Sequence, residues 1–158
     1  MPNKTELLQQ EWDAVLLHFS QQDAFDLGMA VRELAAENRE NISVSIKRGM
    51  QLAFFCAGAQ TSQDNEHWIR RKRNVVERHG HSSLYIRCCY DDNDASYYQK
   101  LGTSPADYAI HGGGFPIRIQ GTGVVGSIIV SGLAGEEDHD LCYRGLLQLK
   151  EAQKKQSQ

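Results

Sequence analysis

The residues most capable of chemistry surround a glycine-rich stretch, HGGGFPIRIQGTGVVGSIIVSG, which runs from His111 to Gly132. Three consecutive glycines, Gly112 to Gly114, leave a bare backbone that a ligand or another chain can approach closely. His111 can act as an acid, a base or a ligand near neutral pH. Arg118, the one cation in an apolar run, has a planar fork that binds carboxylates. We interpret this cluster as a candidate ligand site; the alternative is that the glycines only make a turn and Arg118 lies on an exposed polar face.

A glycine cluster of this kind fits either a phosphate-binding loop or the mouth of a β-hairpin. A phosphate loop leads directly into a helix N-terminus, where free N–H groups and the helix dipole face the anion. Here an alternating apolar run from Phe115 to Ile119 follows instead, and a second run from Val124 to Val130 comes after Gly-Thr-Gly. The sequence therefore predicts a hairpin with the triple glycine at its mouth and exposed main chain at the entrance.

The histidines, the basic run RRKR and Ser127 are better explained as structural residues than as a metal site or catalytic groups. The six histidines form neither an HExxH motif nor a helical pair four residues apart, so no metal site is predicted. In RRKR, Arg70 to Arg73, successive side chains point in different directions on a helix, and Glu66 and Glu77 are spaced to pair with Arg70 and Arg73. Ser127 is expected to be a strand hydroxyl that faces a neighbour rather than a nucleophile.

The hydrophobic pattern predicts the elements that position these residues. Apolar residues three and four apart predict helices at 5–19, capped by Thr5, and at 23–38, capped by Asp23. A hairpin with its turn at Arg48-Gly49 is predicted over 42–56, and its second strand, apolar at Ala53 and Phe55, is expected to be covered on both faces.

The remaining segments complete the order of elements. A helix is expected between Ser62 or Asp64 and Gly80, residues 82–92 favour a helix over a strand, and 93–109 is a connection with a helical turn after Pro105. A last helix begins near Glu136 and gives way to a polar tail from about 151. Hairpins between helices predict a single α/β domain over 1–158, an antiparallel sheet with helices packed on it.

Composition limits the class of protein. The net charge of −3 and the pI near 6.0 argue against a nucleic-acid partner. No apolar run is long enough for a membrane helix, and the start lacks the apolar core of a signal peptide, so a cytoplasmic protein with no membrane partner is expected. Of the four cysteines, Cys56 and Cys142 are expected to be buried, and the adjacent Cys88 and Cys89 have neither disulfide nor zinc spacing.

At the second hairpin the chain resembles the GlcG/HbpS-like family, the "haem-degrading" domain, and most closely its uncharacterised-protein-family branch. The resemblance spans roughly residues 20–150, and the matching segments are HGGGFPI (111–117), GVVGSIIVSG (123–132), Asp138, and NEHWIRRKRNVVERHGHSS (65–83), in which Lys72 matches the family's helix lysine. It implies a profilin-like fold, with an antiparallel sheet of about five strands between helices, assembled into a homo-oligomer.

The resemblance also implies a ligand. Some relatives bind haem and a related domain is attached to a corrinoid-processing enzyme, so a tetrapyrrole such as haem, or a small acidic metabolite, is the implied ligand. The candidate ligand-binding residues are His111, Gly112, Gly113, Gly114, Phe115, Arg118 and Lys72. One position departs from the pattern: Ile129 stands where the wider family has glycine, and its side chain would close a gap through which a ligand approaches.

Three functions remain open at this stage. The first is a non-catalytic oligomeric module that binds a small ligand at the glycine mouth. The second is a structural or adaptor protein whose glycine hairpin meets another subunit. The third is an enzyme on a small metabolite, with His111 or Lys72 as acid or base and Arg118 holding the substrate.

Overall fold

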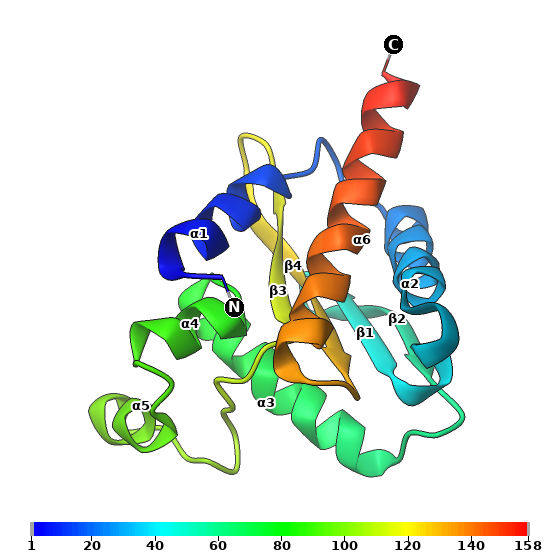
Figure 1. Ribbon diagram of the computed structural model, residues 1–158. Helices are drawn as coiled ribbons and strands as arrows, with labels where there is room; N and C mark the ends of the chain where they lie inside the picture. The colour runs from blue at the N-terminus through cyan, green and yellow to red at the C-terminus, as the bar shows by residue number, and fades with distance from the viewer. Residues whose placement is uncertain (1, 158) are drawn as a thin grey trace.

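The two predicted hairpins join into one antiparallel sheet. The computed structural model describes residues 2–157, and within them the sheet has the strand order β2-β1-β4-β3, with helices on both faces (Figure 1). The elements are α1 (Lys4–Asp13), α2 (Gln21–Ala35), the 3-10 helix η1 (Ala36–Asn41), β1 (Ser43–Arg48), β2 (Gln51–Ala57), α3 (Gln63–His79), α4 (Ser83–Cys89), α5 (Asp94–Leu101), β3 (Gly114–Ile119), β4 (Gly123–Ser131) and α6 (Gly135–Gln156).

The hairpin interpretation of the glycine-rich stretch is confirmed. The chain enters β3 at Gly114, turns after Ile119 and returns as β4, which pairs with β1 on its other side. No helix starts at Phe115, so a phosphate loop is excluded. The favoured helix at 82–92 is also confirmed, as α4.

The sheet has four strands rather than about five. Residues 93–109, expected to be a connection, supply no fifth strand and instead contain α5, which the Asn93 side chain caps by accepting from the Ser96 N–H at 3.0 Å. The single helical turn expected after Pro105 is present, and in it the Tyr108 N–H donates to the Ser104 carbonyl at 3.1 Å. Beside β3 lies a single isolated bridge between Leu16 and Ile119, which is the nearest approach to a fifth strand in the described chain.

That bridge also ends the first helix early. The predicted helix over 5–19 stops at Asp13 because Leu16 uses its backbone to pair with β3: its N–H donates to the Arg118 carbonyl at 2.8 Å, and its carbonyl accepts from Gln120 at 2.9 Å. At the other end the cap is Asn3 rather than Thr5. Leu16 and Phe19, which continued the helical spacing of apolar residues in the sequence, are therefore buried by a non-helical segment instead.

Two other helix ends differ from the prediction. Ser20 caps α2, and Asp23 sits three residues later, where its carboxylate accepts from the Ser20 N–H at 2.8 Å. At the C-terminus α6 continues through the expected polar tail to Gln156. Gln153 in that region is buried, and its amide bonds the backbone of Leu17 and His18.

The two faces of the sheet differ in polarity because strand residues alternate. The face toward α2 and α6 is apolar and holds the main core, including Val44, Ile46, Phe115, Ile117, Ile128 and Val130. The face toward α3 carries four buried serines, Ser43, Ser45, Ser127 and Ser131, and one buried isoleucine, Ile129. Polar side chains of α3 therefore have buried hydrogen-bond partners on the sheet.

The edge strand β2 is less covered than predicted. One side packs on α2, where Phe54 lies directly over Gly28, so that a Cβ on this glycine would come within 2.3 Å of the ring. On the other side Leu52 is 54% and Phe55 40% exposed, because α3 packs mainly over β3 and β4. The expectation that both faces are covered is therefore wrong.

The four cysteines differ in burial and form no disulfide. Cys142 is buried as expected, whereas Cys56 is only partly buried, and all four thiols are free. Over the described part of the chain, no helix combines the length and apolar character needed to cross a bilayer.

Candidate functional site

The three glycines at the hairpin mouth are covered by the chain itself. A Cβ on Gly112 would lie 2.2 Å from the Gly135 carbonyl, and one on Gly113 would lie 2.4 Å from the Val130 carbonyl. Gly114 lies against α3, and its N–H donates to Ser83 Oγ at 2.9 Å. The expected exposed main chain is therefore absent from this part of the structure, and the glycines are needed for close contacts within the protein.

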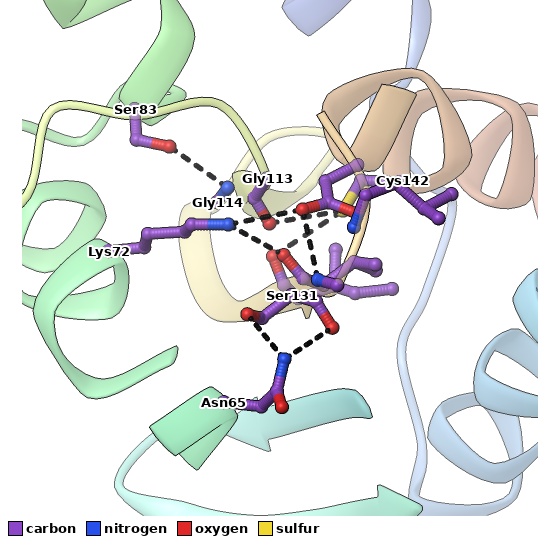
Figure 2. A network of polar contacts seen from close by, with 12 residues as sticks. Asn65, Lys72, Ser83, Gly113, Gly114, Ser131 and Cys142 are labelled. Carbon is purple, nitrogen blue, oxygen red and sulfur yellow. Dashed lines mark hydrogen bonds and ion pairs between the residues drawn. The ribbon is translucent and has the colours of Figure 1, made fainter. Parts of the chain in front are cut away.

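A buried ion pair lies directly beside these glycines. Lys72 of α3 donates from Nζ to the Val130 carbonyl at 2.9 Å and lies 3.4 Å from Asp138 Oδ2, with the two side chains 5% and 1% exposed (Figure 2). The Asp138 carboxylate also accepts from the backbone N–H groups of Leu133 at 3.0 Å and Gly132 at 3.3 Å. The pair thus ties α3, the end of β4 and the start of α6 together.

Burial shifts both members of this pair. Removal from water raises the pKa of Asp138 to about 6, although Lys72 and the two backbone N–H groups oppose the shift. Burial lowers the pKa of Lys72, and the negative charge of Asp138 opposes that shift. Asp138 is therefore ionised at neutral pH but takes up a proton closer to neutrality than an ordinary aspartate does.

A hollow of about 290 Å³ opens over this pair, between α3 and the beginning of α6. The His111 ring meets the Trp68 ring edge-on at 5.4 Å, and the Arg71 guanidinium lies 4.5 Å from the Trp68 ring centre. The lining consists of Asp64, Asn65, Trp68, Lys72, His111, Gly112, Ser131, Gly132, Leu133, Gly135 and Asp138. The hollow is polar at its base and has one aromatic wall.

His111 is oriented by a carboxylate outside the hollow. Its Nε2 lies 2.9 Å from Asp94 Oδ2, and Arg87 Nη1 lies 2.8 Å from the other oxygen of the same carboxylate. Burial raises the pKa of Asp94, but the hydrogen bonds from Arg87 and His111 outweigh it and bring the pKa below its ordinary value. An ionised Asp94 requires the proton on Nε2, which leaves Nδ1 of a neutral His111 as an acceptor.

The start of α6 contributes backbone donors to the same hollow. Its N-cap, Ala134, has no side chain that caps the helix, and Gly135 lines the hollow. The first N–H groups of a helix lack intrahelical partners and carry the positive end of the dipole. These N–H groups can donate to an oxygen-bearing ligand group, while Glu136, Glu137 and Asp138 in the first turn offset part of the positive end of the dipole.

The structure brings together only some of the predicted site residues. Lys72, His111 and Gly112 line the hollow, and Gly113 and Gly114 lie behind it. Phe115 points to the opposite face of the sheet, where its ring lies 5.4 Å from that of His139, because adjacent strand residues face opposite sides.

Arg118 lies at the far end of β3. Its Nη1 is 2.9 Å from Glu11, it also donates to the Gly80 carbonyl, and its guanidinium lies 5.2 Å from the Trp12 ring. The predicted carboxylate partner exists, but it is a residue of α1. The enzyme hypothesis required Arg118 to hold a substrate beside Lys72 or His111, and this geometry does not provide that arrangement.

Several lining residues were missed at the sequence level. Asn65 and Trp68 precede Lys72 by seven and four residues, which places all three on one face of α3, so helical spacing alone was sufficient to find them. Asn65 also donates to Ser131 Oγ at 3.2 Å. Asp138 was noted only as part of the family motif, and its pairing with Lys72 depends on how α6 packs.

The basic run on α3 does not pair with the predicted glutamates. Arg70 forms an ion pair with Asp107 at 3.1 Å, and Arg73 is buried, with Ser45 and Ser127 as its hydrogen-bond partners. Ser127 is therefore a hydroxyl that faces a neighbour, as expected. Ile129 packs against Ile69 and Val76 of α3, so its side chain fills the space between helix and sheet. Nowhere in residues 2–157 do three His, Cys, Asp or Glu side chains gather into a metal-binding group.

His139, next to Asp138 on α6, gives a prediction on pH. Its Nε2 lies 2.7 Å from Gln10 Oε1, its Nδ1 is buried without a partner, and burial lowers its pKa to about 4. Between pH 4 and the ordinary value of 6.5 the unfolded chain binds this proton and the folded protein does not, so stability falls as the pH falls. Asp138, with its raised pKa, acts in the opposite direction between its ordinary value of 3.8 and about 6.

We expect the variant His139→Gln to lack the acid-destabilising contribution. Between neutral pH and about pH 4.5, the free energy of unfolding of the variant should therefore fall by about 2 kcal/mol less than that of the wild type. Urea denaturation at the two pH values measures this difference. Parallel pH dependence in the two proteins would contradict the assignment.

The fold and the site define a class of protein: an α/β module with an antiparallel sheet, helices on both faces and a polar hollow where α3 meets the start of α6. The chain belongs to the HbpS-like family, because the family model described as "Haem degrading protein HbpS-like" matches residues 19–147. Relatives named UPF0303 protein support this assignment. One from Lactiplantibacillus plantarum is 40% identical over 153 residues, covering 97% of this chain and 99% of the relative. One from Streptomyces avermitilis is 41% identical over 147 residues, covering 93% and 90%.

Solved structures show the same fold. The crystal structure of Ybr137w protein superposes with a TM-score of 0.87 at 30% sequence identity, covering 94% of this chain and 88% of the other. The structure titled PduOC:Heme Complex superposes with a TM-score of 0.64 at 17% identity, covering 85% and 95%. The predicted family and fold class are therefore confirmed.

Proposed function

We propose that this protein is a small-ligand-binding module and that the hollow between α3 and α6 binds a small carboxylate-bearing molecule. The observation that carries the proposal is the convergence of buried Lys72, the oriented His111 and the uncapped start of α6 on one hollow of about 290 Å³. The Lys72 ammonium group and the free helix N–H groups favour an anion at that end, and His111 joins them when it is protonated, because both of its ring nitrogens then donate. Asp64 and Asp138 line the same hollow and oppose a highly charged ligand. The module would act as a homo-oligomer, as the resemblance implies, and in the cytoplasm, as the sequence composition led us to expect.

Haem is the second candidate, supported by the description of the family and by the haem complex among the structural neighbours. Haem iron takes His, Cys or Met ligands, and in this hollow His111 Nδ1 is the nitrogen suited to that role. The volume within one chain, about 290 Å³, lies at the lower limit of the roughly 300–1,000 Å³ typical of ligand pockets. This size favours a small acid over an enclosed haem.

The fluorescence of Trp68 provides the test, in a Trp12→Phe background that leaves it the single tryptophan. Titration with lactate, a small monocarboxylate, is expected to give a saturable change, and His111→Ala should weaken the affinity by about tenfold. The control His67→Ala changes an exposed histidine on α3, next to Trp68, and should leave the affinity unchanged.

A parallel titration with haemin tests the second candidate through a saturable shift of its Soret band. A Soret shift that disappears in His111→Ala, with no response to lactate, would replace the small acid by haem. If Trp68 does not respond to lactate and the haemin spectrum equals that of free haemin, the hollow is not the binding site that we propose.

A further inference from the structure

A buried arginine on α3 lacks a carboxylate partner. Among the described residues two cations are buried, Lys72 and Arg73, at 4% and 6% exposure. Lys72 has Asp138 beside it, whereas no carboxylate of residues 2–157 lies within ion-pair distance of Arg73. A charge taken out of water without an opposite charge is costly, so this unpaired guanidinium requires an explanation.

The hydrogen bonds of Arg73 use only part of its fork. Nε donates to Ser127 Oγ at 3.0 Å, and Nη2 donates to the Ser45 carbonyl at 3.0 Å and to Ser45 Oγ at 2.8 Å. These partners are neutral, and within residues 2–157 Nη1 has no hydrogen-bond partner. Burial lowers the pKa of Arg73 to about 10, with Glu77 opposing the shift, so the side chain keeps its charge at neutral pH.

Arg73 lines a second hollow of about 290 Å³, between α3 and the β1–β2 hairpin. Ile69 and the exposed faces of Leu52 and Phe55 form its apolar wall. The other lining residues are polar or charged: Ser45, Lys47, Glu66, Arg70, Asn74 and Glu77. It shares no lining residue with the hollow over Lys72 and Asp138.

This combination selects a particular kind of ligand. A carboxylate at Nη1 would supply the missing negative charge through a charge-assisted hydrogen bond. An apolar body beside it would cover Leu52 and Phe55, which gains free energy in proportion to the apolar area removed from water. Among the other lining residues the charges of Lys47 and Arg70 balance those of Glu66 and Glu77, so Arg73 leaves one positive charge, which matches a single carboxylate better than a phosphate or a dicarboxylate.

We propose that the hollow between α3 and the β1–β2 hairpin is a second ligand site, which binds a small monocarboxylate with an apolar or aromatic body. Arg73 binds the carboxylate, and Phe55 and Leu52 contact the apolar body. The site is independent of the function proposed above, since it uses different residues on a different part of α3.

The test is a titration of the uniformly ¹⁵N-labelled protein with phenylacetate, followed by amide chemical shifts. Saturable changes are expected at residues around the second hollow, with a Kd of about 1 mM. Two probes of similar size separate the contributions: neutral phenylacetamide and dianionic phenyl phosphate should each bind at least about tenfold more weakly.

Two variants assign the binding to named side chains. Phe55→Ala should weaken phenylacetate binding by about fivefold to tenfold, whereas Phe25→Ala, a similarly exposed phenylalanine on α2, should leave it unchanged. Arg73→Gln should abolish it, and if that variant does not fold, Phe55→Ala and the phenylacetamide comparison decide the question. Equal binding of phenylacetamide, unchanged binding by Phe55→Ala, shifts centred on Trp68, or no saturable shifts would each overturn the proposal.

Discussion

The variant Lys72→Met is expected to lose about 3–5 kcal/mol of unfolding free energy at neutral pH. Methionine fills most of the volume of the lysine but leaves the carboxylate of Asp138 buried at 1% exposure without its cation. It also removes the hydrogen bond to the Val130 carbonyl, which is 2.9 Å long in the native protein. Urea denaturation followed by circular dichroism measures the loss.

A second substitution separates the buried charge from the lost packing. In Lys72→Met/Asp138→Asn both charges are gone, and the asparagine side-chain oxygen still accepts from the Leu133 N–H, so part of the loss should be recovered. The single variant should also lose less at about pH 5 than at about pH 8, because protonation of Asp138 relieves the unpaired charge. A loss that is independent of pH, or a double variant no more stable than the single, would mean that the pair is not what stabilises this junction.

Local periodicity predicted most of the elements, and long-range pairing explains where it failed. The hairpins, α3 and α4 follow from alternation, helical spacing and caps within each segment. α1 ends where it does because the backbone of Leu16 pairs with the edge of β3, more than 100 residues along the chain. Nothing in the sequence near Leu16 indicates that partner. The exposed side of β2 similarly depends on which strands α3 covers.

The candidate site was only partly predictable for the same reason. Alternation along β3 was sufficient to place Phe115 on the face opposite Gly114, and a strand rise of about 3.3 Å per residue separates Gly114 from Arg118 by about 13 Å. A single ligand-binding cluster spanning all of these residues was therefore inconsistent with the predicted strand. By contrast, the pairing of Lys72 with Asp138 requires the packing of α6 against the hairpin mouth, which a single sequence does not reveal.

Because the hairpin mouth is closely packed, Gly113→Ala is expected to cost about 4 kcal/mol of unfolding free energy. Gly113 has φ +124°, a conformation that residues with a side chain rarely adopt. A Cβ there would lie 2.4 Å from the Val130 carbonyl and 2.7 Å from Lys72 Nζ. The Val130 carbonyl is part of the sheet and cannot move without disturbing the pairing of β4 with β1.

Gly121→Ala is the matched control, because it isolates the backbone cost from the steric cost. Gly121 lies in the turn of the same hairpin with φ +77°, and a Cβ there would meet nothing within 4 Å. Its substitution should therefore cost only about 1 kcal/mol, the penalty for a left-handed residue with a side chain. Denaturation midpoints of the two variants, measured under the same conditions, give the comparison. Equal losses at both positions would show that the contacts of Gly113 with Val130 and Lys72 do not determine the stability of this junction, and that positive φ alone accounts for the glycine.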